Sequence, residues 1–128
     1  MGRAIYTENA PKPLGMYSQA IKCGLTIYCS GQIGIEPATG QLVAGLENQF
    51  EQALYNLQAV LAKTNMDKNQ IVKATIFVAV EHEDDFQRIN NVYNHFFSDS
   101  YTLPARSLVG VKTLPGNALV EIEAIAHK

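Results

Sequence analysis

The sequence is poor in the features that mark several large classes of protein. Its 128 residues include only two cysteines, Cys23 and Cys29, and their spacing fits neither a zinc site nor a thioredoxin-type pair. Both lie in strand-like sequence, so we expect buried free thiols. The three histidines lack a second ligand at metal spacing and are expected at the surface: His82, His95 and His127. We therefore expect no metal site.

Basic clusters and long apolar runs are also missing. The formal net charge is -2 and the sequence pI is about 5.9, which disfavours a nucleic-acid partner. No apolar run approaches the roughly 20 residues that a membrane span needs. Residues 1–12 lack the apolar middle of a signal peptide. We expect a cytoplasmic protein without a membrane partner.

The composition that remains is that of a globular chain. Hydrophobic residues make up 47% and charged residues 17%, with nine glycines and five prolines spread along the sequence. A chain of this length can bury one core but not two. We therefore predict a single domain over residues 1–128.

Hydrophobic spacing predicts two helices and five strands. Apolar residues recur every three or four positions over residues 46–63 and 83–98, which indicates amphipathic helices. Residues 71–80 are almost continuously apolar and predict a central strand. Residues 19–22 and 25–30 predict a hairpin around Cys23-Gly24, and residues 31–34 and 37–40 predict loops. The last two strands, 106–113 and 118–126, should form a hairpin around Pro115-Gly116.

This order of elements predicts an α+β fold. Each amphipathic helix needs cover for its apolar face, and one sheet face can cover both. The other face also carries apolar residues, since such residues occupy both faces of the last strand. Oligomerisation through that face would bury them.

Arg106 and Glu121 are the first candidates for chemistry. Arg106 begins a strand, where its guanidinium could bind a carboxylate through two hydrogen bonds, although a surface ion pair would explain it too. Glu121 lies mid-strand, where a carboxylate could position water and move a proton. Protection of a sheet edge, or an ion pair with Arg106 or Lys112, is the alternative.

The predicted hairpin permits a geometric estimate. A two-residue turn at Pro115-Gly116 would place Arg106 opposite Ile125 and Glu121 opposite Gly110. Arg106 and Glu121 would then share a face about 13 Å apart, at about 3.3 Å per residue. A ligand or a neighbouring subunit would have to bridge them, unless a bulge changes the register.

Three further positions are weaker candidates. Tyr17 could point its phenol into a pocket or pack in the core or an interface. Ser30 and Gly31 follow a strand, where a glycine lets a ligand approach the backbone, but nothing activates Ser30 as a nucleophile. Asn90 lies on the second helix, on a solvated face unless that helix borders a cleft.

Taken together, the sequence resembles the YjgF/RidA family, the reactive intermediate imine deaminases, over nearly its whole length. The segments that carry the resemblance are Gly15-Met16-Tyr17-Ser18-Gln19-Ala20, Ile27-Tyr28-Cys29-Ser30-Gly31-Gln32-Ile33, Thr39-Gly40-Gln41-Leu42-Val43, Val72-Lys73-Ala74-Thr75-Ile76-Phe77, Pro104-Ala105-Arg106-Ser107, Leu114-Pro115 and Val120-Glu121-Ile122-Glu123-Ala124-Ile125-Ala126. Leu108 and Met16 depart from the family pattern, where cysteine and proline are common.

The resemblance implies a chorismate-mutase-like domain with a mixed sheet, assembled as a homotrimer with ligand clefts between subunits. It implies hydrolysis of 2-iminobutanoate and 2-iminopropanoate to 2-oxobutanoate or pyruvate plus ammonia, without a cofactor. Arg106 and Glu121 would be catalytic, Arg106 by holding the carboxylate. The residues that would bind substrate are Tyr17, Ser30, Gly31, Asn90, Arg106, Ser107 and Leu108, the last through its backbone.

Two other functions compete with this interpretation. The first is a regulatory trimer that binds keto or imino acids without turnover. The second is an RNA-directed activity, because some relatives are described as translation inhibitors or ribonucleases. The negative net charge and the lack of a basic, aromatic platform weigh against RNA.

Overall fold

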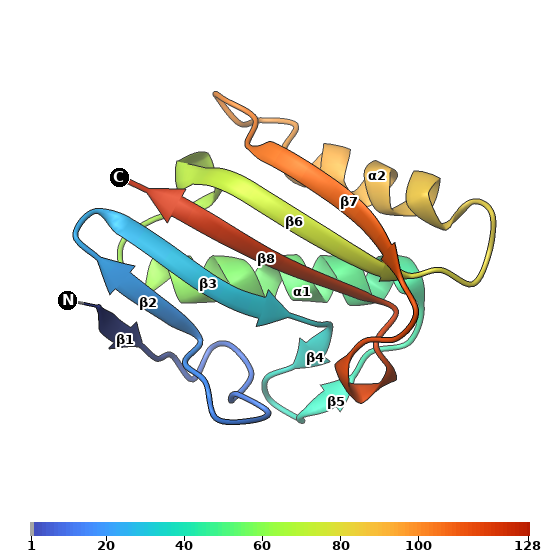
Figure 1. The fold of residues 1–128 in the computed structure, drawn as a ribbon, viewed down its shortest axis with the longest axis horizontal. Coiled ribbons are helices and arrows are strands. Elements are labelled where there is room, and N and C mark those ends of the chain that lie inside the picture. The colour runs from blue at the N-terminus through green and yellow to red at the C-terminus, as the bar shows by residue number, and fades with distance from the viewer. Residues whose placement is uncertain (1) are drawn as a thin grey trace.

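The computed structural model describes residues 2–128, which form one large sheet, a small two-stranded ribbon and two long helices (Figure 1). The elements are β1 (Arg3–Ile5), β2 (Ala20–Cys23), β3 (Thr26–Gln32), β4 (Ile35–Glu36), β5 (Gln41–Leu42), α1 (Leu46–Ala62), β6 (Ile71–Ala79), α2 (Asp85–Phe96), β7 (Ala105–Val111) and β8 (Val120–His127), with short 3₁₀ turns at Lys68–Gln70 and Pro115–Asn117.

The large sheet has the strand order β1-β2-β3-β8-β6-β7. Neighbouring strands are antiparallel except β6 and β7, which run parallel, so the sheet is mixed. A parallel pair needs a long crossover, and α2 supplies it. Both helices lie behind the sheet on one face (Figure 1). The prediction of a mixed sheet with two helices on one face is therefore confirmed.

The helix-covered face of the sheet contains the main core. Side chains alternate along β6 and β8, and the inward set is fully or almost fully buried: Ala74, Ile76, Val78, Val120, Ile122, Ala124 and Ala126. The apolar stripe of α1 packs on this set through Phe50, Leu54, Leu57 and Leu61. This packing fixes which residues of each strand remain for the opposite face, because successive side chains point to opposite sides.

The opposite face, called the open face below, is only partly buried. It carries Glu121, Glu123 and Ile125 of β8, next to Thr75 and Phe77 of β6. Tyr28 and Val109 lie on this face with 49% and 40% of their surface exposed. These exposed apolar groups agree with burial by another copy of the chain, which stays a prediction.

The expected C-terminal hairpin is wrong. β7 and β8 are both neighbours of β6, one on each side, and do not pair with each other. Residues 112–119 instead carry the chain past the end of β6, with a 3₁₀ turn at Pro115–Asn117 where two hairpin residues were expected. The crossover through α2 favours this arrangement because it places β7 beside β6 before β8 is reached.

The remaining differences are local. β3 extends through Gln32, beyond the expected end at residue 30, and β1, β4 and β5 were not predicted. The Gly24 turn between β2 and β3 is confirmed, with φ at 59°. Cys29 is buried, and burial raises the pKa of its thiol to about 12, but Cys23 is exposed, because its side chain lies at the strand end. All three histidines are exposed, as expected.

No helix in residues 2–128 has the length and hydropathy to cross a bilayer.

A candidate active site in two parts

Arg106 lies near the start of β7, with its side chain on the helix-covered face. Its register partner on β6 is the fully buried Ala74, which places both residues on that side of the sheet. Nη1 of Arg106 donates a hydrogen bond to Oδ1 of Asn90 on α2 at 2.7 Å. Asn90 therefore lies beside Arg106, and its role in binding substrate stays a prediction.

The guanidinium also rests on an aromatic ring. Its Cζ lies 4.6 Å from the ring centroid of Tyr93, one helical turn beyond Asn90. Tyr93 is only 6% exposed, and burial raises its phenol pKa, with the nearby charge of Arg106 opposing the shift. In the sequence, Tyr93 falls within the apolar spacing of residues 83–98, which indicates packing and not a place beside Arg106. Its spacing of three from Asn90 is the signal that could have linked it to the site.

Glu121 lies on the open face of β8, beside Phe77 of β6. Its carboxylate packs against Gly31 of β3: a Cβ added at residue 31 would lie 2.7 Å from both Cδ and Oε2 of Glu121. Partial burial raises the pKa of Glu121, and the negative charge of Glu123 adds to the increase. A carboxylate with a raised pKa is a stronger base than an ordinary one.

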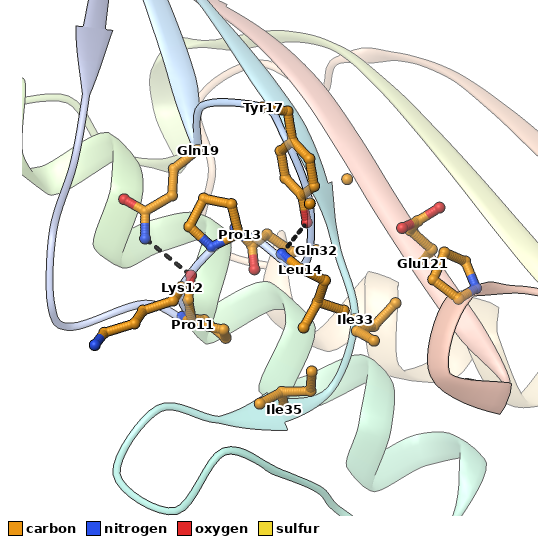
Figure 2. A pocket seen from close by; sticks show the side chains of 13 residues that line it. Pro11, Lys12, Pro13, Leu14, Tyr17, Gln19, Gln32, Ile33, Ile35 and Glu121 are labelled. Carbon is orange, nitrogen blue, oxygen red and sulfur yellow. Dashed lines mark hydrogen bonds between the residues drawn. The ribbon is translucent and has the colours of Figure 1, made fainter.

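Glu121 borders a cleft of about 270 Å³. The cleft lies between the loop that precedes β2, the end of β3 and the turn before β8, and its lining residues are Pro11, Lys12, Pro13, Leu14, Gly15, Tyr17, Gln19, Gly31, Gln32, Ile33, Ile35, Pro115 and Glu121 (Figure 2). Lys12 directs its ammonium away from Glu121 (Figure 2). Glu121 and Lys12 are therefore the two charged residues among those that line the cleft, and their charged ends lie apart.

Buried hydrogen bonds hold the loop that forms one wall of the cleft. The side chain of Gln19 accepts from the Thr7 backbone N–H at 2.7 Å and donates to the carbonyls of Thr7 and Pro11 at 3.0 and 2.9 Å. The Tyr17 hydroxyl accepts from the Leu14 N–H at 3.0 Å (Figure 2). Tyr17 thus lines the cleft while its hydroxyl fixes the loop.

The neighbouring residues have different surroundings. The register of β3 shifts between Cys29 and Gln32, so Ser30 and Gly31 lie at an irregularity of the strand. The Ser30 hydroxyl donates to the Ser18 carbonyl at 2.6 Å, which ties β3 to the chain ahead of β2. Within residues 2–128 no histidine is hydrogen-bonded to Ser30, so its hydroxyl has a structural partner and no activating base.

Ser107 and Leu108 point to opposite sides of β7. The Ser107 hydroxyl, on the open face, accepts from Nζ of Lys73 at 3.2 Å. Leu108 packs against the core on the helix-covered face. The side chain of Leu108 is therefore occupied by packing, which leaves its backbone as the part available to a ligand.

Arg106 and Glu121 do not share a face, which corrects the expectation from the hairpin. Arg106 is level with Ala74 on the helix side, whereas Glu121 is level with Phe77 on the open side, and β6 runs between them. Within residues 2–128, no ion pair links Glu121 to Arg106 or Lys112. One copy of the chain thus carries the two candidate residues on separate surfaces, Arg106 beside α2 and Glu121 at the cleft.

Nowhere in residues 2–128 do three or more histidine, cysteine, aspartate or glutamate side chains gather as a metal site requires.

Comparison with known proteins gives one consistent family. The profile of the family described as Endoribonuclease L-PSP matches residues 7–128. A RutC family protein of Pyrococcus horikoshii is 44% identical, over 100% of this chain and 99% of its own. A 2-iminobutanoate/2-iminopropanoate deaminase of Dermatophagoides farinae is also 44% identical, over 96% of this chain and 94% of its own.

Solved structures agree with these sequence matches. The YjgF gene product of E. coli superposes with a TM-score of 0.92 at 40% identity and covers 98% of each chain. The structure of E. coli TdcF with bound serine has a TM-score of 0.92 at 36% identity, again over 98% of each chain.

Proposed function

We propose that this chain, which belongs to the YjgF/RidA family, hydrolyses 2-iminobutanoate and 2-iminopropanoate to 2-oxobutanoate and pyruvate with release of ammonia. Relatives 43–44% identical over almost the whole chain bear the name of that deaminase. The observation that carries the proposal is the carboxylate of Glu121, half-buried at the edge of an apolar cleft, where its pKa is raised.

The reaction needs water, a base and an orienting charge. The protonated imine carbon is electrophilic, and Glu121 would take a proton from the water that attacks it, forming a carbinolamine. The protonated Glu121 would then return that proton to the nitrogen. As the C–N bond breaks and the C=O bond forms, Glu121 takes the remaining hydroxyl proton and passes it to the departing ammonia, which leaves as ammonium, so atoms and charges balance. No covalent enzyme intermediate is needed, and positioning with general-base help supplies the acceleration.

Arg106 would hold the substrate carboxylate. Asn90 engages Nη1, and the Tyr93 ring supports one side of the guanidinium plane. A planar guanidinium oriented in this way can still offer parallel N–H groups to a carboxylate. The bound serine of the E. coli relative is a carboxylate-bearing molecule and supports a ligand of this class. The other expected substrate contacts would come from the Gly31 amide and the backbone at Ser107 and Leu108.

The separation of Arg106 and Glu121 on opposite faces supports an active site built between copies of the chain. We propose a homotrimer, in which the open face of one subunit is covered and the Arg106 edge of one copy approaches the Glu121 cleft of another. Light scattering on the purified protein tests this assembly. A stable monomer that turns over substrate at the full rate would contradict it.

Turnover is tested in a coupled assay, in which a second enzyme produces the imine that this protein would hydrolyse. A threonine dehydratase generates 2-iminobutanoate in the cuvette, and its decay is followed by absorbance with and without the protein. The proposal requires faster decay than in buffer and faster formation of 2-oxobutanoate. If decay stays at the buffer rate while 2-oxobutanoate binds to the protein, the deaminase proposal is wrong. A regulatory trimer that binds keto acids without turnover is then the better interpretation.

The matching family is described as an endoribonuclease, so an RNA-directed nuclease is the second candidate function. The cleft argues against it, because Glu121 faces the cavity and would repel a phosphate backbone. Incubation of the protein with labelled single-stranded RNA tests it, and cleavage lost in Glu121→Gln would favour the nuclease.

A further inference from the structure

Apolar side chains make up most of the cleft wall away from Glu121. They include Leu14, Ile33, Ile35, Pro13 and Pro115. Ile33 and Ile35 are 6% and 8% exposed and form a small cluster with Ala118, separate from the main core. These side chains therefore offer a ligand an apolar surface that does not depend on a rearrangement of the core.

The backbone behind these isoleucines is fixed to α1. The Nδ2 atom of Asn56, a residue 1% exposed, donates to the carbonyls of Ile33 and Ile35 at 3.1 and 2.9 Å. Gly34 lies so close to the helix that a Cβ there would approach the Gln49 backbone to 2.5 Å. This wall is therefore held in place before any ligand binds, which lowers the cost of binding.

The size of the cleft exceeds what the smallest imino acids need. Its volume of about 270 Å³ is close to the lower end of the roughly 300–1,000 Å³ seen for sites that enclose whole drug-sized ligands. A methyl or ethyl side chain would leave most of this apolar space to water. A branched or aromatic side chain would displace that water and bury apolar surface.

We infer that the apolar end of this cleft binds the side chain of the substrate, and that the protein prefers 2-imino acids with bulky apolar side chains over 2-iminopropanoate. The inference rests on the proposed deaminase activity. The imine carbon must lie near Glu121 for water attack, and the carboxylate must point to Arg106 of another copy. The side chain is then left facing Leu14, Ile33 and Ile35.

A substrate series tests the inference. An L-amino-acid oxidase with catalase produces the imines of alanine, leucine, methionine and phenylalanine, and semicarbazide traps whatever the protein has not hydrolysed. We expect kcat/KM for the leucine imine to exceed that for the alanine imine by at least about tenfold, since a single methylene in an apolar pocket is worth roughly 10- to 200-fold.

A matched pair of variants locates the preference. Leu14 is 61% exposed on the cleft loop, so Leu14→Trp can reduce the space without disturbing the core. Leu25 is 57% exposed in the β2–β3 turn, roughly 20 Å from the cleft at about 3.3 Å per residue along β3. The ratio of kcat/KM for the leucine imine to that for the alanine imine should fall about tenfold in Leu14→Trp and stay unchanged in Leu25→Trp.

The outcomes separate the inference from the activity on which it rests. If the alanine imine is hydrolysed as fast as the leucine imine or faster, the bulky preference is wrong and the deaminase stands. If no imine is hydrolysed, the proposed function fails. Calorimetry with the corresponding 2-oxo acids then tests whether the apolar end of the cleft binds a bulky side chain. Tighter binding of 4-methyl-2-oxopentanoate than of pyruvate supports it, whereas equal, weaker or absent binding overturns it.

Discussion

Glu121 packs its carboxylate directly over Gly31, with space for a hydrogen but not for a methyl group at residue 31. The atoms that a methyl would meet belong to a side chain that can rotate, so the fold can accommodate the change by moving the carboxylate. We therefore expect Gly31→Ala to fold with near-normal stability but to lose about 100-fold in turnover, the cost of a displacement of about 1 Å. Gly110→Ala, in which the added methyl approaches the Val80 side chain at 3.3 Å, is the control. Equal turnover in the two variants would contradict the role of this contact.

Glu121→Gln should separate chemistry from binding. The amide keeps the shape of the side chain but cannot take a proton from water, so kcat should fall by about 10²- to 10⁴-fold with little change in the affinity for 2-oxobutanoate. Glu123→Gln is the matched control, because Glu123 lies on the same face two residues away and is exposed. Steady-state kinetics and calorimetry provide the two readouts. Loss of affinity in parallel with kcat would indicate a structural acid.

The same substitution should stabilise the protein at neutral pH. A folded-state pKa raised above the unfolded value means that the folded form holds the proton more tightly, so stability is fully present below the unfolded pKa and is lost as pH rises through the raised value. Glu121→Gln removes that loss. Urea unfolding should show Glu121→Gln more stable than wild type at pH 7, and the gap should close near pH 4. If the difference in unfolding free energy between the two proteins widens on acidification, the pKa of Glu121 is lowered by folding and not raised.

Arg106→Lys should lose most activity while the assembly persists. An ammonium cannot reproduce two parallel hydrogen bonds to a carboxylate, and it would lose the planar contact with Tyr93. We expect KM to rise more than tenfold, measured with 2-iminobutanoate, and light scattering to show an unchanged mass. Near-normal kinetics would refute Arg106 as the anchor.

Tyr93 should act through Arg106. Replacement of the ring in Tyr93→Leu removes a cation–π contact worth about 0.5–2 kcal/mol, which predicts a KM increase of roughly 2- to 30-fold. Tyr93→Phe keeps the ring and should restore most of the affinity. If Tyr93→Phe is as impaired as Tyr93→Leu, the phenol oxygen and not the ring is what matters.

Gln19 should control the order of the cleft loop. Gln19→Leu leaves the Thr7 N–H and the Thr7 carbonyl without their buried partner, at a cost of about 1–3 kcal/mol for each group. Urea unfolding should show a lower free energy of unfolding, and amide exchange at Thr7 should accelerate. Exchange at wild-type rates would show that other contacts hold the loop.

The local elements followed from the sequence because their causes are local. The spacing of Phe50, Leu54, Leu57 and Leu61 places one apolar stripe on α1, and the alternation along residues 120–126 separates the two faces of β8. The motif around Arg106 and Glu121 also identified the candidate residues by resemblance. The Gly24 turn and both helices lie within one or two residues of their predicted limits.

What the tertiary structure alone decided is the relation of those residues to one another. Alternation within a strand does not say which strand it pairs with, and a turn signal at Pro115-Gly116 favoured a hairpin that does not form. The crossover of α2 puts β7 beside β6, and β8 then occupies the other edge of β6. Strand pairing is set by long-range packing, so only the folded chain reveals that Arg106 and Glu121 lie on opposite faces of the sheet.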